Sequence, residues 1–124
     1  MEDFCNEAYY LFFSVLASRT RLAIFDVLRE GSKTVSEISV ALKQEQAIIS
    51  MNLNQMERVA LVLLEGVGEQ KRYALNKEIV EPLFHLLAFH VAKHCPGLKE
   101  CIPQERLREY MKKEAAKETY IEHE

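Results

Sequence analysis

The sequence contains no tryptophan, only three cysteines, and no long uninterrupted apolar run. A membrane-spanning helix needs roughly 20 consecutive apolar residues, so no span is expected, and no charged-then-apolar leader with a cleavage site is recognisable. Three cysteines are too few, and odd in number, for the disulfide framework of a small secreted protein. We therefore expect a soluble, cytoplasmic protein with no membrane partner.

The usual catalytic patterns are also missing. There is no Gly-rich phosphate loop, no Ser-His-Asp or Cys-His signature, and no pair of carboxylates in a cleft-like context. We therefore expect that the chain is not an enzyme. Its 124 residues are enough for one domain with a single core.

A helix–turn–helix is predicted in residues 34–57. Thr34, with Glu37 three residues later, forms a reciprocal capping pair that begins a first helix ending near Leu42. After a short polar turn, a second helix is expected from about Glu45 to Glu57. The apolar side chains of this second helix fall on one buried face: Ile49, Leu53 and Met56.

A two-stranded hairpin is predicted immediately after this motif. The expected strands, Val62–Glu65 and Gln70–Leu75, flank Gly66-Val67-Gly68, whose glycines suit a turn. A helix–turn–helix followed by a β-wing is a DNA-reading module whose second helix enters the major groove. Double-stranded operator DNA is therefore the expected partner.

Helices are predicted on both sides of this module. An aromatic-rich helix from about Asn6 to Leu16 is followed by a helix that carries Leu22, Phe25 and Leu28 and stops at Gly31, a natural C-terminal cap. A long helix runs from about Glu78 to Cys95, a loop covers Pro96–Pro103, and a charged helical tail begins at Gln104. The expected fold is mainly α with a small β-hairpin, in the order α-α-α-α-β-β-α plus the tail. We expect a single domain over residues 1–124, with a winged-helix core over 6–95 and a Cys-containing loop and tail over 96–124.

The long helix carries two apolar seams. The first comprises Ile79, Leu83, Leu86, His90 and His94, and the second comprises Phe84, Ala88, Val91 and Cys95. A helix with two such seams must be covered from both sides, and in so small a chain the second cover is expected to be another subunit.

The outward face of the second motif helix is the candidate DNA-reading surface. Gln and Asn side chains can pair with adenine, Ser can reach a phosphate or a base, and Ala or Met can touch a thymine methyl. Lys71 and Arg72, beside the wing turn, are candidates for phosphate or minor-groove contact. The alternative is an ordinary solvated helix face and a pair of exposed strand residues. The outward residues are Gln46, Ala47, Ser50, Met51 and Asn54.

The charge balance opposes DNA binding. The chain has a formal net charge of −3, and residues 34–72 contain four Lys or Arg against five Glu. Because Lys and Arg supply most non-specific affinity for phosphates, that component should be weak. A winged-helix interaction module that no longer binds DNA is therefore the alternative function.

Two groups of residues are candidate inducer sites. His90 and His94 are four residues apart on one helix face, which suits a zinc-like ion, or else they are half-buried seam residues. Cys95 and Cys101 lie across a Pro-Gly turn, and Cys5 could join them as a three-thiolate site for arsenite, or two thiols could form a disulfide or sulfur-bridged pair. The alternatives are three unrelated cysteines and a repressor without a small-molecule inducer. No cofactor is certain.

Over residues 8–95 the chain resembles the ArsR/SmtB family of winged-helix repressors. Residues 16–28 are similar to the family pattern Leu-x-x-x-Thr-Arg-Leu-x-Ile-x-x-x-Leu, and the likeness continues through residues 35–38, 49–56 and 71–75. The resemblance implies a homodimer, built from the first and last core helices, that represses its operator until an inducer binds. Inducers in the family include zinc, cadmium, lead, arsenite and reactive sulfur species, and some relatives place inducer-binding cysteines at the end of the last helix.

The chain departs from the family pattern at three places. Thr34 and Ser36 stand where the family's thiolate metal site has Cys-x-Cys, so that site is absent. Residues 50–52 read Ser-Met-Asn where the family often has Ser-Arg-His, and Ala60 replaces a glycine that usually follows this helix.

Overall fold

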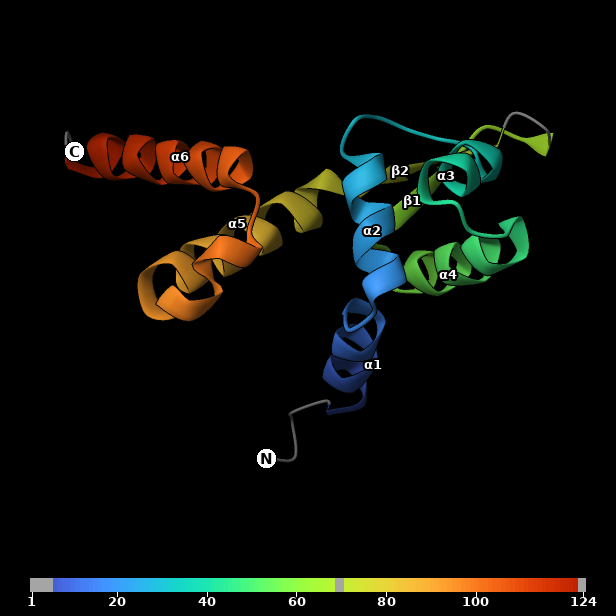
Figure 1. Ribbon diagram of the computed structural model, residues 1–124, viewed down its shortest axis with the longest axis horizontal. Coiled ribbons are helices and arrows are strands. Elements are labelled where there is room, and N and C mark those ends of the chain that lie inside the picture. Colours follow the sequence, from blue (N-terminus) through green and yellow to red (C-terminus); the bar gives the residue numbers. More distant parts are fainter. Residues whose placement is uncertain (1–5, 69–70, 123–124) are drawn as a thin grey trace. The chain divides into compact units, whose positions relative to one another are not determined.

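The computed structural model describes residues 6–68 and 71–122, without the side chains of residues 110, 114, 115 and 117–122. Within these ranges the fold is mainly α-helical with one antiparallel hairpin, which confirms the predicted fold class (Figure 1). Cys5 and Gln70 lie outside the described residues. The elements are α1 (Asn6–Leu16), α2 (Arg19–Leu28), α3 (Val35–Leu42), α4 (Gln46–Arg58), β1 (Val62–Glu65), β2 (Arg72–Leu75), α5 (Lys77–His94), the 3-10 helix η2 (Pro96–Cys101) and α6 (Gln104–Glu122).

The chain divides into two compact units, the first ending at Asn76 and the second beginning at Lys77. The first unit holds α1 to β2, and the second holds α5, η2 and α6. A single domain over the whole chain stays a prediction. The predicted division into a winged-helix core over residues 6–95 and a tail over 96–124 also stays a prediction.

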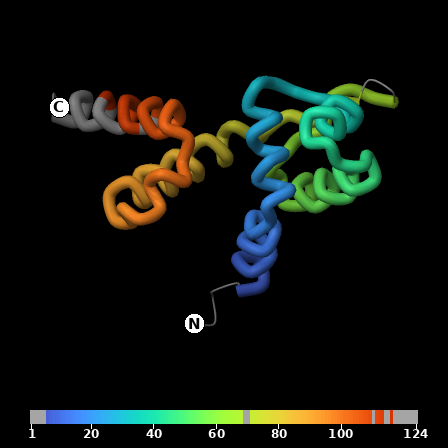
Figure 2. Tube along the Cα trace, in the orientation of Figure 1, coloured from blue at the N-terminus to red at the C-terminus, as the bar shows by residue number. Residues whose placement is uncertain are grey.

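The helix–turn–helix forms as the sequence predicts. Thr34 Oγ1 accepts a hydrogen bond from Glu37 N at 3.1 Å, and Glu37 Oε1 accepts one from Thr34 N at 3.2 Å, which completes the capping box. Helix α3 ends at Leu42 and is capped by Lys43, which adopts the left-handed conformation with φ of 55°, and the chain then turns into α4 (Figure 2). The three predicted inward residues of α4 are all fully buried: Ile49, Leu53 and Met56.

The wing is a hairpin of two four-residue strands, and it forms one β-bridge to a residue outside the hairpin that the sequence did not predict. Its register pairs Val62 with Leu75, and the glycines of its turn both have positive φ. Lys33, just before α3, forms a bridge with Tyr73: Lys33 N donates to Tyr73 O at 3.0 Å and Tyr73 N donates to Lys33 O at 2.8 Å. The wing is thereby fixed to the start of α3.

Helix α2 differs from the prediction in its buried face and its end. Leu22 is 41% exposed, and Ile24 takes the buried place beside Phe25 and Leu28. The helix ends at Leu28 with Arg29 as its cap residue, so Gly31 is not the cap. Gly31 lies beyond it, in a turn with φ of 140°.

The two seams of α5 have different environments. The second seam, which contains Phe84, Ala88, Val91 and Cys95, is buried or half-buried, together with Val80 and the unpredicted His85. In the first seam, Ile79, Leu86, His90 and His94 are exposed in the single chain, and the alternative that a second subunit half-buries the histidines stays a prediction. The predicted loop after α5 is instead mostly the 3-10 helix η2. No helix in the described ranges is both long and apolar enough to cross a membrane.

Arg21 holds α4 in place through a buried polar contact. Its Nε donates to Asn52 Oδ1 at 3.0 Å, and its Nη1 donates to the carbonyl of Val15 at the end of α1 at 3.2 Å. Asn52 in turn donates from Nδ2 to Ile48 O at 2.8 Å. A guanidinium beside the last carbonyls of a helix is also favoured by the helix dipole. Arg21 on α2 therefore reaches α1 and α4 through neutral acceptors.

Replacing Asn52 with Ala should destabilise the fold by about 1–3 kcal/mol, because Arg21 Nε loses its buried acceptor. Asn54→Ala is the matched control, since Asn54 is exposed on the same helix and should change stability by less than about 0.5 kcal/mol. Urea unfolding of both variants measures the difference. Equal stability of the two variants would show that the Arg21–Asn52 contact contributes nothing.

The end of α4 has a strained residue. Leu61 N donates to Met56 O at 3.0 Å and Ala60 N donates to Glu57 O at 2.9 Å, the two bonds of a Schellman motif. Such a motif needs a left-handed residue, and Ala60 supplies it with φ of 58°. An alanine in this conformation costs roughly 1–2 kcal/mol. This is the physical reason why a glycine suits the position.

Ala60→Gly should therefore raise the free energy of unfolding, by about 1 kcal/mol. Ala47→Gly in α4 is the opposite control, because Ala47 is helical and glycine there should cost up to about 1 kcal/mol. Thermal and urea unfolding of both variants would show whether the free energy of unfolding rises in Ala60→Gly and falls in Ala47→Gly. A destabilised Ala60→Gly variant would contradict the strain at this residue.

Candidate nucleic-acid interface

The predicted reading face of α4 is accessible. Gln46, Ala47, Met51 and Asn54 are exposed, and Ser50 is half-buried. Gln46 Nε2 donates to Ser36 Oγ at 3.1 Å, which links the first turn of α4 to the first turn of α3. The burial of Ile49, Leu53 and Met56 on the opposite side fixes this orientation. Contact of these residues with DNA stays a prediction.

Asn52 is absent from that face. Sequence comparison places it where the family often has histidine, but its side chain is buried and bonded to Arg21. Its role in this chain is to orient α4. Patterns within one helix could not reveal this, because the partners are 31 residues apart.

The two wing candidates have different surroundings. Arg72 donates from Nε to Ser32 Oγ at 3.2 Å and from Nη2 to Ser32 O at 2.9 Å, and Nη2 lies 3.2 Å from Glu37 Oε1. Its guanidinium therefore ties β2 to the start of α3. Lys71 is exposed. Of the two, Lys71 is better placed for a phosphate, since Arg72 would have to exchange internal partners.

Glu37 is the centre of a small polar network. The backbone N–H of Thr34 lowers the pKa of the Glu37 carboxyl below its ordinary value, and the Thr34 side chain, Arg72 and Lys33 act in the same direction. A carboxylate with a lowered folded pKa stabilises the fold above its unfolded pKa, and this contribution is lost as the pH falls through the folded value. The network at the start of α3 is therefore intact at neutral pH and weakens only in acid.

The inducer candidates that can be described lie at the end of α5 and in η2. The rings of His90 and His94 are 5.0 Å apart between centroids, as four-residue spacing on a helix requires. Cys95 is half-buried, Cys101 is exposed at the end of η2, and both are free thiols. Across residues 6–68 and 71–122 no three His, Cys, Asp or Glu side chains gather closely enough to hold a metal ion. A complete site would need ligands from elsewhere, such as Cys5 or a second chain.

One family model matches part of the chain. A family model described as "Bacterial regulatory protein, arsR family" matches residues 18–62, which run from the start of α2 to the first residue of β1. No protein of curated function matches the chain significantly.

Solved structures resemble the fold over most of the chain. The homodimeric winged helix-turn-helix DNA-binding domain Mb0332 from Mycobacterium bovis is 27% identical, with 72% of this chain and 82% of that chain covered and a TM-score of 0.64. Reduced HlyU from Vibrio cholerae is 22% identical over 73% of this chain and 92% of that one, with a TM-score of 0.57. NolR from Sinorhizobium fredii is 22% identical over 67% and 83%, with a TM-score of 0.60.

The segment that the family model matches contains α2, α3, α4 and the start of β1. It therefore includes the accessible polar face of α4. Residues 18–62 thus match the ArsR family model, and the chain resembles solved winged helix-turn-helix proteins, among them a homodimeric DNA-binding domain described as a possible ArsR-family regulator.

Proposed function

We propose that this protein is a homodimeric, sequence-specific repressor that reads operator DNA with α4 and is released by an inducer at its C-terminal thiols. The observation that carries the proposal is the accessible face of α4, which presents Gln46, Ser50 and Asn54 within an ArsR-family motif. Gln and Asn can each make paired hydrogen bonds to adenine, and Met51 can touch a thymine methyl. The preferred operator is therefore rich in A·T pairs.

Apolar surface supports the homodimer. In α1 the exposed large side chains are Tyr9, Tyr10, Leu11 and Phe13. In α5 the exposed residues include Ile79, Leu86 and Leu87. Contiguous apolar surface of this kind on a helix marks an interaction site. We assign these two helices to the interface between two copies of the chain.

A dimer explains how so acidic a chain could bind DNA. Two copies of α4 can meet successive half-sites about one helical turn apart, which doubles the base contacts without adding positive charge. Non-specific affinity is expected to stay low, because phosphate neutralisation is weak in a chain with a net charge of −3. Discrimination between operator and random DNA would then come mainly from α4.

Fluorescence anisotropy of a labelled duplex from the gene's own promoter, with excess random DNA, tests this function. Asn54→Ala should weaken operator binding by about 1–3 kcal/mol for each half-site, since each subunit of the dimer loses one paired contact to adenine. Lys71→Gln removes one cation from each subunit of the dimer, so it should weaken all duplexes alike and reduce the slope of log affinity against log salt by about 1.8.

Lys113→Gln is the control for charge, because Lys113 lies on α6 and pairs with Glu109 at 3.5 Å. It should leave DNA affinity unchanged. A folded, reduced dimer that binds no promoter duplex better than random DNA would overturn the proposal. It would favour the winged-helix interaction module, which the acidic balance of residues 34–72 supports.

Thiol sensing is proposed at Cys95 and Cys101, with Cys5 as a third ligand. Cys95 ends the half-buried seam of α5 and precedes η2, and Cys101 is the last residue of η2. Thiolates are the preferred ligands of soft ions such as arsenite. Binding at this junction would act on the end of a proposed dimerisation helix. His90 and His94 are the corresponding candidates for a zinc-like ion.

The double variant Cys95→Ser/Cys101→Ser should retain operator affinity and lose the response to arsenite. In the native chain, arsenite should reduce affinity by roughly 5–150-fold, the usual range of allosteric coupling. The same anisotropy assay measures both. His90→Gln/His94→Gln is the control, since it should remove a response to zinc but not to arsenite. Unchanged induction by arsenite in the cysteine variant would rule out this mechanism.

A further inference from the structure

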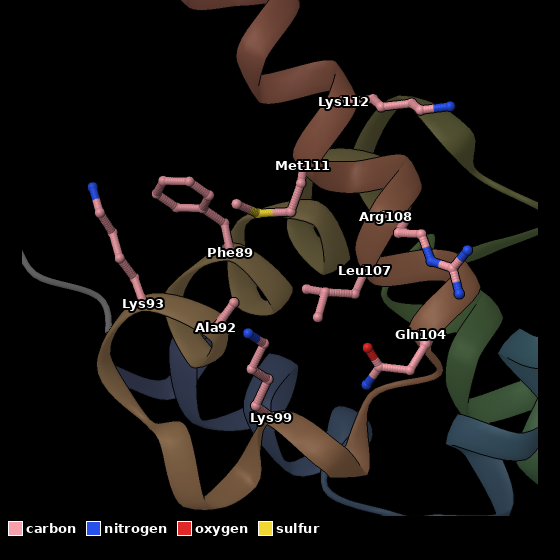
Figure 3. Close-up of a pocket in the computed structure, with 9 residues that line it drawn as sticks. All are labelled: Phe89, Ala92, Lys93, Lys99, Gln104, Leu107, Arg108, Met111 and Lys112. Atoms are coloured by element: carbon pink, nitrogen blue, oxygen red, sulfur yellow. The ribbon is translucent and has the colours of Figure 1, made fainter.

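The second unit contains a pocket that the DNA-reading function does not use. It lies between α5, η2 and α6 and has a volume of about 710 Å³ (Figure 3). This volume falls within the range of roughly 300–1,000 Å³ typical of small-molecule sites. Every residue that lines it belongs to the unit beginning at Lys77.

The inner surface of the pocket is apolar. Phe89 and Ala92 of α5 face Leu107 and Met111 of α6 across it (Figure 3). Leu107 is buried, while Met111 is 42% exposed at the mouth. An aliphatic chain or an aromatic ring would therefore find apolar contacts on two sides.

The rim is positively charged. It contains Lys93, Lys99, Arg108 and Lys112, and no carboxylate whose side chain the structure describes lines the pocket. From Lys77 onward the sequence contains eight Lys or Arg and nine Asp or Glu, so half of the cations and none of the described carboxylates gather here. This segregation contrasts with the acidic balance of the whole chain.

Two details suit the rim to an anion. Lys93 Nζ lies 5.1 Å from the centre of the Phe89 ring, a cation–π contact that holds the ammonium above the apolar surface. Lys99 extends from η2 with its nitrogen toward Ala92, and the Gln104 amide lies beside it (Figure 3). An anionic head could thus meet Lys99 and Gln104 while its apolar tail contacts Phe89, Leu107 and Met111.

We propose that this pocket binds an amphipathic monoanion, a carboxylate with an aliphatic tail of medium length. Four cations, with no described carboxylate among the lining residues, select the negative head, and the two facing apolar helices select the tail. The proposal does not depend on DNA binding or on the cysteines, because no residue of the DNA-reading face and no cysteine lines the pocket.

Isothermal titration of the full-length protein with decanoate, below its micelle concentration, tests the proposal. We expect saturable binding of one decanoate per chain, with decanol and acetate each binding at least tenfold more weakly. Lys93→Gln/Lys99→Gln should weaken decanoate by about tenfold, since each exposed charge contact contributes a few-fold. Met111→Gln should weaken it by a similar factor, because it places a polar group at the mouth.

Lys113→Gln is the matched control, because it removes a cation of α6 that does not line this pocket. It should bind decanoate like the native protein, and far-UV circular dichroism should show that every variant is folded. Absence of saturable binding would overturn the proposal. So would equal binding of decanol, or decanoate affinity that is the same in the native protein and in Lys93→Gln/Lys99→Gln.

Discussion

The hydrogen bond from Arg21 Nε to Asn52 Oδ1 fixes the orientation of the proposed DNA-reading helix. Arg21 also reaches the last carbonyls of α1, so a single guanidinium sets the positions of three helices. Because Asn52 is buried on α4, the opposite side of that helix is turned toward solvent. The accessible row of Gln46, Ser50 and Asn54 depends on this constraint as much as on the apolar residues beneath it.

A second polar network fixes the wing in the same way. Lys33 pairs with Tyr73 through two backbone hydrogen bonds, and Arg72 contacts both Ser32 and Glu37. Glu37, which completes the capping box of α3, is thus also an anchor for β2. The wing and the helix–turn–helix are positioned together, as a module that must contact a groove and the adjacent backbone requires. The arrangement uses one of the few cations of the motif for structure, which leaves less positive charge for phosphates.

Charge is distributed unevenly between the two units. Residues 34–72 contain four Lys or Arg together with five Glu, whereas the pocket of α5, η2 and α6 collects four cations around an apolar interior with no described carboxylate in its lining. The proposed reading of bases by amides therefore fits the motif, and the proposed binding of an anion fits the second unit. Cys95 and Cys101 border the same η2 segment that contributes Lys99 to the pocket. A ligand of either chemistry would act on the end of α5.

The sequence by itself determined the α-helices of the motif, the hairpin and the buried face of α4, because capping pairs, turn glycines and apolar periodicity are local signals. The sequence also showed that Ala60 replaces the glycine usual in the family. The strain at Ala60 arises because the Schellman motif requires a left-handed residue there. Only the tertiary structure decided that Asn52 faces inward, that Arg72 has internal partners, and that Ile24 replaces Leu22 in the core. The Arg21–Asn52 and Arg72–Ser32 contacts join residues that are 31 and 40 positions apart. The burial of Ile24 in place of Leu22 depends on which side of α2 the neighbouring elements cover. No short-range pattern encodes such contacts, since packing alone selects among the faces that periodicity allows.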